Sequence, residues 1–425
     1  MGEIKTENFS WECPINGVQP ENPQTCRRGY LCPMPANYQL KTVTDFAEFH
    51  RVLDVIYADD PLYVYPLRDD IEGILSEKNA AHTGDNLRKW VVLQDGKTPV
   101  GRIAAFIDEA RNAELDLKAG GIGFFEATQV EKVAELLFDA AENWLRERGM
   151  DAVDGPINFG ERDKFWGLLT TGRYRPIYQE TYNPAYYRRY FEERGYVAHE
   201  QCLTMRGIVA EFPGDRLGKL ADRVRERYGL YTKQLTKGNL REGADDFAEA
   251  YNAAFNHWPY FKPLTGDDIY PTFQQMKPIM DPHLTCLAYN KEDRPIGLAG
   301  LIPDINCFQR GLKGKMNLWE LPRFLYRLKF QKQPRNCKGI AFGIAQDYQR
   351  QGVYPLMVNA MFTSGNYHTS RVYKYVDMAT IRGHNKVMID TCRQMNTEIH
   401  REHIAFRKGL REGVSWEAFD FVEVG

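Results

Sequence analysis

A short turn near the C-terminal end of the chain carries the residue pattern that is best suited to chemistry. The apolar run Gly339 to Ala345 leads through three more residues into the turn Gln349 to Tyr354, and a helical pattern begins at Pro355. A strand that breaks into a helix leaves backbone N–H groups unpaired at the positive end of the helix dipole, which suits a phosphate group. Arg350 adds a cation there, and Gly352 lets a ligand approach the backbone closely. The turn therefore predicts a pyrophosphate site; the alternative is an ordinary strand-turn-helix link with a glycine at the bend.

The length and composition are those of a globular protein with more than one domain. A chain of 425 residues exceeds the ~100–200 residues of a typical domain, so two or three domains with full cores are expected. The formal charge of −2 predicts no nucleic-acid partner, and no apolar stretch approaches the ~20 residues that span a bilayer. The polar N-terminal sequence lacks the apolar core of a secretory signal, which predicts a cytoplasmic protein.

The eight cysteines indicate reduced thiols rather than a disulfide framework, because they are scattered through a long chain without a secretory signal. Cys13, Cys26 and Cys32 cluster, but their spacing matches no standard zinc site and no histidine nearby completes a set of four ligands. No metal is therefore expected.

The apolar periodicity predicts a mixed α/β unit that follows an irregular arm. Residues 1–37 are rich in Pro, Asn and Gly and are interpreted as the arm. After it we expect a strand (38–43), helices (44–57 and 67–77), a hairpin that turns at Asp95-Gly96, a strand (122–126), a long amphipathic helix (129–148) and a strand at 152–153.

The same order of elements returns from about residue 230. We expect a strand (231–235), helices (244–255 and 267–280), a hairpin (285–289 and 295–302), a strand (340–345) with its helix, and a strand at 376–380. Duplication explains this repetition most economically, although a coarse α/β pattern makes many chains look repetitive. The predicted organisation is an arm (1–37) and two domains, 38–212 and 213–425. Near the end of the chain, His400 and His403 could face a common ligand, but they are assigned to a solvated helix end because Arg401, Glu402, Arg407 and Lys408 crowd the same segment.

Several short sequence matches, together with this repeated order, resemble the GNAT acyltransferase superfamily. The similarity extends from about residue 38 to 410 and is particularly clear to tandem GNAT-like bacterial proteins of the YghO-like group. It implies an α/β (α+β) fold of two tandem GNAT-like domains, each a mixed central sheet flanked by helices. The matching pieces are Val100-Gly101-Arg102-Ile103-Ala104-Ala105, Gly123-Phe124-Phe125-Glu126, Gly155-Pro156-Ile157-Asn158, Tyr182-Asn183-Pro184-Ala185-Tyr186-Tyr187 and Pro303-Asp304-Ile305-Asn306.

The resemblance implies acetyl-CoA or a longer acyl-CoA as co-substrate, held by the second half of the chain. In the superfamily, the fourth strand and a Gln/Arg-x-x-Gly-x-Gly/Ala turn hold acyl-CoA, and the amides of the turn bind its pyrophosphate. Gln349 and Gly352 match this turn, whereas Tyr354 stands where Gly or Ala is usual. The Tyr354 side chain either narrows the phosphate-binding site or points away from it. The corresponding turn of the first half, 126–130, lacks the glycine and the basic residue, which implies that this half lost cofactor binding. The residues expected at the cofactor are Ile344, Ala345, Gln346, Gln349, Arg350, Gln351, Gly352, Val353, Tyr354 and Asn385.

The catalytic groups are less well defined. Acyl transfer to an amine needs a base for the ammonium proton and an acid for the leaving thiolate. The candidate bases are Glu126 and Asp377, at or near strand positions that can face a cleft, and then His384; a structural role is the alternative for each. Asn385 is expected either to cap the next helix or to touch the pantetheine arm. Related enzymes often carry a tyrosine after this asparagine, and none occurs in residues 386–395, so the acid is unassigned.

A basic amphipathic segment at residues 317–332 adds a prediction about partners. Leu321, Phe324, Leu325 and Leu328 recur at helical spacing, and nearly every charge across 310–338 is basic. Such a helix can lie on an anionic bilayer, cover an acyl chain or attract the phosphates of the cofactor. The alternative is a surface helix that packs its apolar stripe on the core.

These observations predict an acyl-CoA-dependent N-acyltransferase that acts on a small-molecule or lipid amine. The alternative from a different class is a non-catalytic acyl-CoA-binding protein, which Tyr354 and the missing acid favour. A scaffold without a small-molecule function is a weaker third reading, and the sequence predicts no oligomeric state.

Overall fold

Most of the elements predicted for the first half are present in the computed structural model, which describes residues 36–113, 116–257, 261–330, 335–363 and 372–424. The predicted arm, with its three cysteines, lies almost wholly outside these ranges, and residues 38–425 form one unit. The predicted hairpin turn is confirmed, because Asp95 and Gly96 both have positive φ and join two antiparallel strands. The first half contains β1 (Tyr38–Thr42), α1 (Ala47–Ile56), α2 (Arg68–Ile74), β2 (Leu87–Gln94), β3 (Thr98–Phe106), α3 (Glu109–Asn112), β4 (Ala119–Ala127), α4 (Glu131–Glu147), β5 (Ala152–Gly155), β6 (Leu168–Thr171), α5 (Tyr187–Glu193) and β7 (Val197–Ile208).

The second half repeats the predicted series and adds elements that the periodicity did not predict. Its strand after the hairpin begins at Arg335, five residues before the predicted start, and α6 comes before the repeat begins. The elements are α6 (Gly214–Tyr228), β8 (Tyr231–Lys233), α7 (Leu240–Phe255), α8 (Gly266–Met276), β9 (Thr285–Tyr289), β10 (Pro295–Pro303), α9 (Glu320–Phe330), β11 (Arg335–Ile344), α10 (Val353–Val358), β12 (Tyr373–Arg382), α12 (Lys386–Arg393) and β13 (Thr397–Gly409).

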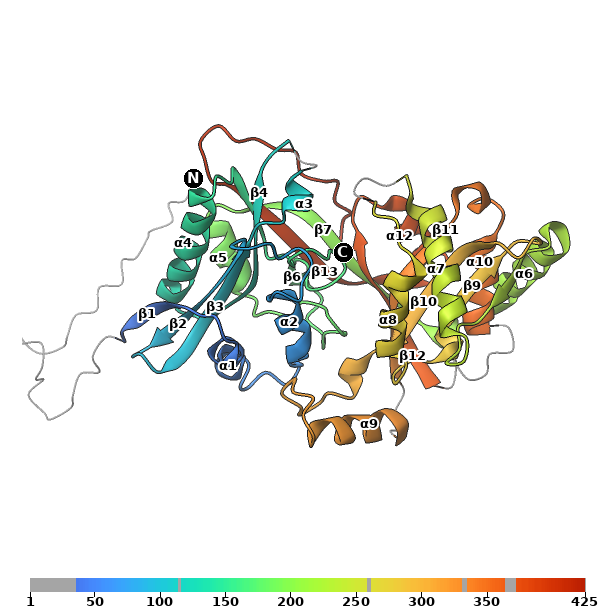
Figure 1. Ribbon diagram of the computed structural model, residues 1–425, viewed down its shortest axis with the longest axis horizontal. Coiled ribbons are helices and arrows are strands. Elements are labelled where there is room, and N and C mark those ends of the chain that lie inside the picture. Colours follow the sequence, from blue (N-terminus) through green and yellow to red (C-terminus); the bar gives the residue numbers. More distant parts are fainter. Residues whose placement is uncertain (1–35, 114–115, 258–260, 331–334, 364–371, 425) are drawn as a thin grey trace, which may run out of the picture. The chain divides into compact units, whose positions relative to one another are not determined.

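One sheet runs through the unit, in the order β1-β2-β3-β4-β5-β13-β7-β12-β11-β10-β9-β8, with β6 on β13. Each half contributes four antiparallel strands and then a parallel pair, β4 with β5 and β11 with β12. The last strand of each half lies against the other half, because β13 pairs with β5 and β7 pairs with β12. Figure 1 shows β7 and β13 between the two strand sets. The halves therefore share the middle of the sheet, and the boundary at residues 212 and 213 remains a prediction.

The prediction of a solvated helix end at His400 and His403 is wrong. Both residues lie in β13, where their odd spacing turns their side chains to opposite faces of the sheet. The four charged residues that suggested exposure are Arg401, Glu402, Arg407 and Lys408, and two of them, Arg401 and Arg407, are buried. Long-range pairing with β7 and β5 decides the conformation of this segment, and its local composition does not show that pairing.

Helices cover both faces of the sheet, which explains why its strands are apolar runs rather than alternating sequences. In β2, Trp90 and Val92 pack in a cluster with the buried face of α4, whereas Val91 and Leu93 pack in another cluster with α1 and α2. In the second half, α6, α10 and α12 contribute to one cluster and α7 to others. Strands that are buried on both faces are expected to read in this way.

Candidate active site

Each half has a point in the sheet where a parallel strand pair separates. β4 and β5 pair only up to Gly121 and Asp154. β11 and β12 pair only up to Gly339 and Met378, after which β11 follows β10 and β12 follows β7. The separation opens a notch between the two strands, and we call these places the first-half notch and the second-half notch.

Backbone amides of β11 are available in the second-half notch. On the other edge of β11, the Ala345 N–H donates to the Ile296 carbonyl over 2.9 Å. Because the N–H groups of a strand alternate in direction, those of Phe342 and Ile344 point toward the notch. Of the residues expected at the cofactor, Ile344 therefore turns its amide toward the notch, whereas the amide of Ala345 is used within the sheet.

The predicted phosphate turn follows β11 directly. Gly352 has φ of 79° at the start of α10, a backbone conformation that favours glycine. A Cβ at this position would also lie 2.6 Å from a methyl group of Val224, so space is a second reason for glycine. Among the described residues, the amides of Gly352 and Val353 have no hydrogen-bond partner. Gln349 and Arg350 are exposed, and the Gln351 side chain donates to the Asp347 carbonyl just before the turn. The role of these residues at a pyrophosphate remains a prediction.

Tyr354 and Asn385, both predicted near the cofactor, make contacts with or within α12. The Tyr354 hydroxyl donates to the Thr391 carbonyl over 3.1 Å, and its ring meets Phe342 edge-on. Tyr354 thus points away from the turn, which is one of the two predicted alternatives. The Asn385 side chain accepts a hydrogen bond from the Met388 N–H over 3.1 Å and caps α12.

Two of the three predicted base candidates lie away from the cavities of the site. Asp377 is fully buried in β12 and forms a two-pronged ion pair with Arg206, at 2.7 and 2.8 Å. His384 is exposed and stacks on Phe419. Burial of part of its ring lowers the pKa of His384. Neither residue lines the three cavities that are described next.

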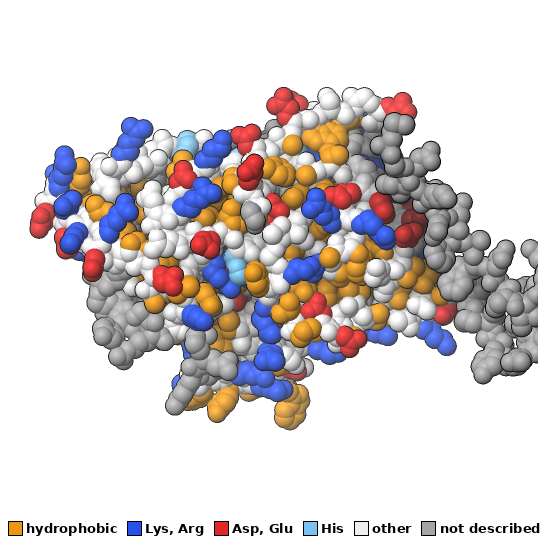
Figure 2. All heavy atoms as spheres, turned by 180° about the vertical axis from the view of Figure 1, so that it is seen from behind, with side chains coloured by type: hydrophobic (Ala, Val, Ile, Leu, Met, Phe, Trp, Pro, Cys, Tyr) orange, Lys and Arg blue, Asp and Glu red, His pale blue; other side chains and the backbone are white. Residues whose placement is uncertain are grey.

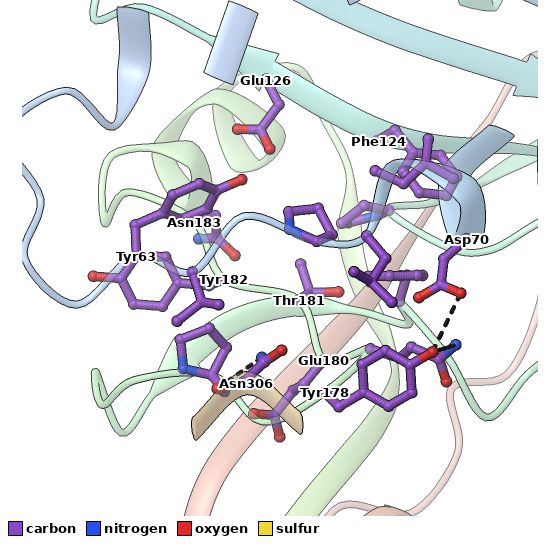
Figure 3. Close-up of a pocket in the computed structure, with 18 of the residues that line it drawn as sticks. Tyr63, Asp70, Phe124, Glu126, Tyr178, Glu180, Thr181, Tyr182, Asn183 and Asn306 are labelled. Carbon is purple, nitrogen blue, oxygen red and sulfur yellow. Dashed lines mark hydrogen bonds between the residues drawn. The ribbon is translucent and has the colours of Figure 1, made fainter. Parts of the chain in front are cut away.

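The third candidate, Glu126, lines a cavity of about 750 Å³ at the first-half notch, part of which opens to solvent. The wall combines aromatic and aliphatic side chains with three carboxylates (Figure 3). Glu126 lies in Figure 3 on the side of the cavity opposite Glu180 and Tyr178. The residues that line this first cavity include Tyr63, Leu67, Asp70, Ile71, Phe124, Glu126, Phe165, Leu168, Tyr178, Gln179, Glu180, Thr181, Tyr182, Asn183 and Asn306.

The Glu126 carboxylate is held by a buried polar network. It accepts hydrogen bonds from the hydroxyls of Tyr57 (2.7 Å) and Tyr187 (2.9 Å), and a guanidinium nitrogen of Arg102 lies at 3.5 Å. Burial raises the pKa of Glu126, although Arg102 and the two tyrosines oppose the shift. The side chain is therefore oriented into the cavity and its proton affinity is increased.

A second cavity of about 290 Å³ adjoins the first. It reaches the point where β11 and β12 separate, which we call the tip of the second-half notch. The two share the wall residues Phe165, Gln179, Glu180 and Thr181. Glu180 accepts hydrogen bonds from Thr204 (2.5 Å) and pairs with Arg401 (3.1 Å). Burial acts to raise the pKa of Glu180, but Arg401, His403 and its hydrogen bonds hold that pKa below its usual value. Glu180 is therefore a charged carboxylate at the junction of the cavities.

Lys338, next to the last paired residue of β11, lines this second cavity. It is buried, and its ammonium donates to the Tyr178 carbonyl over 2.8 Å. No carboxylate of the described residues lies within ion-pair distance of it. Burial lowers the pKa of Lys338, against the attraction of Asp163 and Glu180. A buried lysine without an ion pair is suited to give and take protons.

A third cavity of about 340 Å³ lies at residues of β10, β11 and β12 beside the second-half notch. Its wall is apolar and rich in methionine and phenylalanine. The lining includes Phe212, Leu301, Phe342, Met361, Phe362, Val376, Met378 and Met395.

Sequence reasoning did not find Lys338 or Glu180. Lys338 had a sequence signal, because a charged residue directly before the apolar run 339–345 needs a reason to be there. Glu180 had none: it lies in an irregular segment, 178–183, that reaches both cavities only through the tertiary fold. The tyrosines between residues 178 and 190 have two kinds of surroundings. Tyr178 and Tyr182 line the first cavity, whereas Tyr187 and Tyr190 are buried in the core.

The comparison with solved structures shows that the chain has the fold of tandem GNAT proteins. The tandem GNAT protein from the clavulanic acid biosynthesis pathway aligns with 89% of this chain and 100% of its own, with a TM-score of 0.52 at 11% identity. The GCN5-related glucosamine N-acetyltransferase region of a fungal multi-domain β-N-acetylglucosaminidase aligns with 88% of this chain, with a TM-score of 0.52 at 15% identity. This chain spans 38% of the length of that fungal protein. No family model matches the chain.

In sequence, the chain is similar to two curated bacterial proteins. It is 25% identical to protein YghO of Escherichia coli (strain K12) over 316 residues, which is 74% of this chain and 79% of YghO. It is 23% identical to the bacterial ceramide synthase of Caulobacter vibrioides over 383 residues, which is 87% of this chain and 96% of that enzyme. Within the described residues, no helix has the length and apolar character that crossing a bilayer demands.

Proposed function

We propose that the chain is an acyl-CoA-dependent N-acyltransferase whose acceptor is an amine on a long apolar chain. The observation that carries this proposal is the adjacency of the first and second cavities, which together extend from the first-half notch to the tip of the second-half notch. The tandem GNAT fold supports acyl transfer. The similarity to bacterial ceramide synthase supports the acceptor class, because a ceramide is an N-acylated long-chain amine.

The second-half notch has the groups that acyl-CoA needs. The N–H groups of Phe342 and Ile344 point into this notch, where they can donate to carbonyl groups of the pantetheine arm. Beyond them, Gly352 keeps the backbone of the turn accessible and Arg350 supplies a cation for the pyrophosphate. The apolar third cavity suits the acyl chain. Acyl-CoA supplies the thioester carbonyl that the amine attacks.

The first cavity has the groups that a long-chain amine needs. Its aromatic and aliphatic wall excludes water from an apolar chain, and its carboxylates attract an ammonium group. Glu180 lies where this cavity meets the second, so it draws the ammonium toward the tip of the second-half notch. Glu126, with its two tyrosines and Arg102, binds polar groups of the acceptor at the other side.

Lys338 is the residue that we assign to the proton of the attacking ammonium. It lies next to the point where β11 and β12 separate, and burial lowers its pKa, so that its uncharged form can accept a proton. If Glu126 were the base, as the sequence analysis predicted, the amine would have to react within the first cavity rather than at Lys338 in the second. No role is assigned to Asp377, whose carboxylate is fully used by Arg206. The cytoplasmic location predicted from the sequence remains a prediction.

The proposal is tested by binding and turnover measured on the same preparation. Calorimetry with acyl-CoAs of increasing chain length measures affinity, and thiol release in the presence of short and long amines measures transfer. We expect tighter binding of longer acyl chains and thiol release that depends on a long-chain amine. Binding of acyl-CoA without turnover would support the non-catalytic binder, and absence of binding to any acyl-CoA would contradict both functions.

A further inference from the structure

The outward half of α9 is apolar. Leu321, Leu325, Tyr326 and Phe330 are 42%, 40%, 65% and 55% exposed, and Pro322 is exposed beside them. At about 100° per residue these side chains cover one side of the helix, with Lys329 as the polar exception. Just before the helix, Leu318 and Trp319 are 89% and 87% exposed. We call residues 318–330 the α9 surface.

Contacts on the opposite side of α9 hold it in this orientation. Phe324, its buried residue, packs in a cluster with Phe308 and Leu312. The Arg327 guanidinium donates to the carbonyls of Phe308 (3.0 Å) and Arg310 (2.6 Å). The inward side therefore has its own partners, and the predicted packing of an apolar stripe on the core accounts for Phe324 but not for the larger outward set.

Basic side chains surround the exposed apolar residues. Glu320 is the one acidic residue in the sequence from 310 to 330. Figure 2 shows lysine, arginine and hydrophobic side chains gathered on the projection that α9 forms at the lower edge of the view. The exposed basic residues are Arg310, Lys313, Lys315, Arg323 and Lys329. An unusually exposed apolar patch with a basic rim, and with Trp319 and Tyr326 in it, is the composition of a surface that inserts into a bilayer interface.

We propose that the α9 surface docks this protein on anionic lipid bilayers. The apolar side chains enter the boundary between headgroups and acyl chains, Trp319 and Tyr326 lie at the headgroups, and the basic residues contact lipid phosphates. A bilayer matches both parts of the surface, whereas a second copy of the chain would have to supply an acidic partner for the rim.

The α9 surface is joined to the wall of the first cavity. The cluster around Phe324 includes Leu67 and Tyr178 as neighbours, and both residues line that cavity. Docking would therefore hold the acceptor cavity close to the membrane that contains a long-chain amine. This last step rests on the proposed function, whereas the docking itself does not.

Vesicle sedimentation of the full chain tests the docking. Vesicles of phosphatidylcholine alone and of phosphatidylcholine mixed with phosphatidylglycerol are compared, at low and high salt. The test variant is Leu321→Ser/Leu325→Ser/Tyr326→Ser, and the control is Val387→Ser/Phe421→Ser, which removes exposed apolar residues elsewhere. We expect the wild type and the control to bind the anionic vesicles, less so at high salt, and the test variant to bind at least tenfold more weakly.

Several results would overturn the inference: no binding of the wild type to anionic vesicles, equal binding by the test variant, or a change of oligomeric state in that variant, which would identify a second copy as the occupant. Acyl transfer from a soluble acyl-CoA to a detergent-dispersed amine should be unchanged in the test variant. Vesicle binding by a chain without transferase activity would uphold the docking while contradicting the proposed function.

Discussion

The two notches are built from the same strand arrangement but differ in what occupies them. In each, a parallel pair separates beside a non-glycine residue with positive φ, Phe124 in β4 and Thr380 in β12. In the first-half notch, Ile157 contacts β4 beside the first cavity: its N–H donates to the Ile122 carbonyl, and its carbonyl fills the place that a Cβ of Gly123 would take. In the second-half notch, by contrast, the N–H groups of Phe342 and Ile344 point between the separated strands.

The ends of the two notches differ in charge as well. The second-half strand leads into a turn with Gly352 and Arg350, whereas the first-half strand leads into α4 with Glu131 in its first turn. An acidic first turn favours the helix but repels a phosphate. The same strand arrangement thus carries a carboxylate-lined cavity in one half and a notch with inward-pointing backbone N–H groups in the other.

The largest expected effect comes from removing the lysine at the tip of the second-half notch. Lys338→Met should lower kcat for acyl transfer about 10²–10⁴-fold, because the proposed proton acceptor is lost, and leave acyl-CoA affinity within about twofold. Lys89→Met is the matched control, since Lys89 is also buried and donates to backbone carbonyls, but away from the cavities. Equal activity of both variants would remove Lys338 from the mechanism.

The second prediction concerns Asp304 in the second half of the chain. Its carboxylate accepts a hydrogen bond from the N–H of Tyr178 in the first half. Burial, and then Asp377, raise the pKa of Asp304 to about 6 from 3.8. Since the folded state holds this proton more tightly than the unfolded state, the contribution of Asp304 to stability is present at low pH and is lost as pH rises from about 4 to about 6, by ~3 kcal/mol.

Asp304→Asn keeps an acceptor oxygen but cannot ionise. As the pH rises from about 4 to about 6, the wild type should therefore lose stability that the variant keeps, so the free energy of unfolding of the variant minus that of the wild type should increase. Urea unfolding at several pH values measures the difference. Asp390→Asn, at an exposed position, should follow the wild type. A difference between Asp304→Asn and the wild type that does not change with pH would show that Asp304 is not the titrating group.

A smaller effect is expected in the first-half cavity. Glu126→Gln still accepts hydrogen bonds from Tyr57 and Tyr187 but loses the charge, so kcat/KM for the amine should fall about 10–100-fold while the affinity for acyl-CoA stays the same. If Glu126 is the base, as the sequence suggested, the loss should appear in kcat and match that of Lys338→Met.

The smallest effect is expected at the phosphate turn. Gly352→Ala should weaken acyl-CoA binding several-fold and cost about 1–2 kcal/mol of stability, because a positive φ and contact with Val224 both oppose the new methyl group. Gly413→Ala is the control: its φ is also positive, but open space surrounds it. A similar loss of acyl-CoA affinity in both variants would contradict a phosphate-binding site at Gly352.

Local pattern predicted the parts of the fold that depend on neighbours in sequence. The hairpin at Asp95-Gly96 forms because these residues tolerate positive φ, and α4 forms because its apolar residues recur at helical spacing. The wrong prediction at His400 and His403 came from reading charge as exposure, although Arg401 and Arg407 are buried beside carboxylates from distant segments, Glu180 and Asp154.

For the site, local sequence was enough to predict the turn at Gly352, because its residues are adjacent in the chain, and to select Glu126 as a candidate by its strand position. Their roles at a cofactor and in catalysis remain predictions. Only the tertiary structure decided that Asp377 is engaged by Arg206, that Lys338 and Glu180 meet the same cavity, and that the outward side of α9 is uncovered. The physical reason is common to all of these: each depends on burial and pairing between segments more than 100 residues apart, or on the absence of such a partner, and local periodicity contains no information about either.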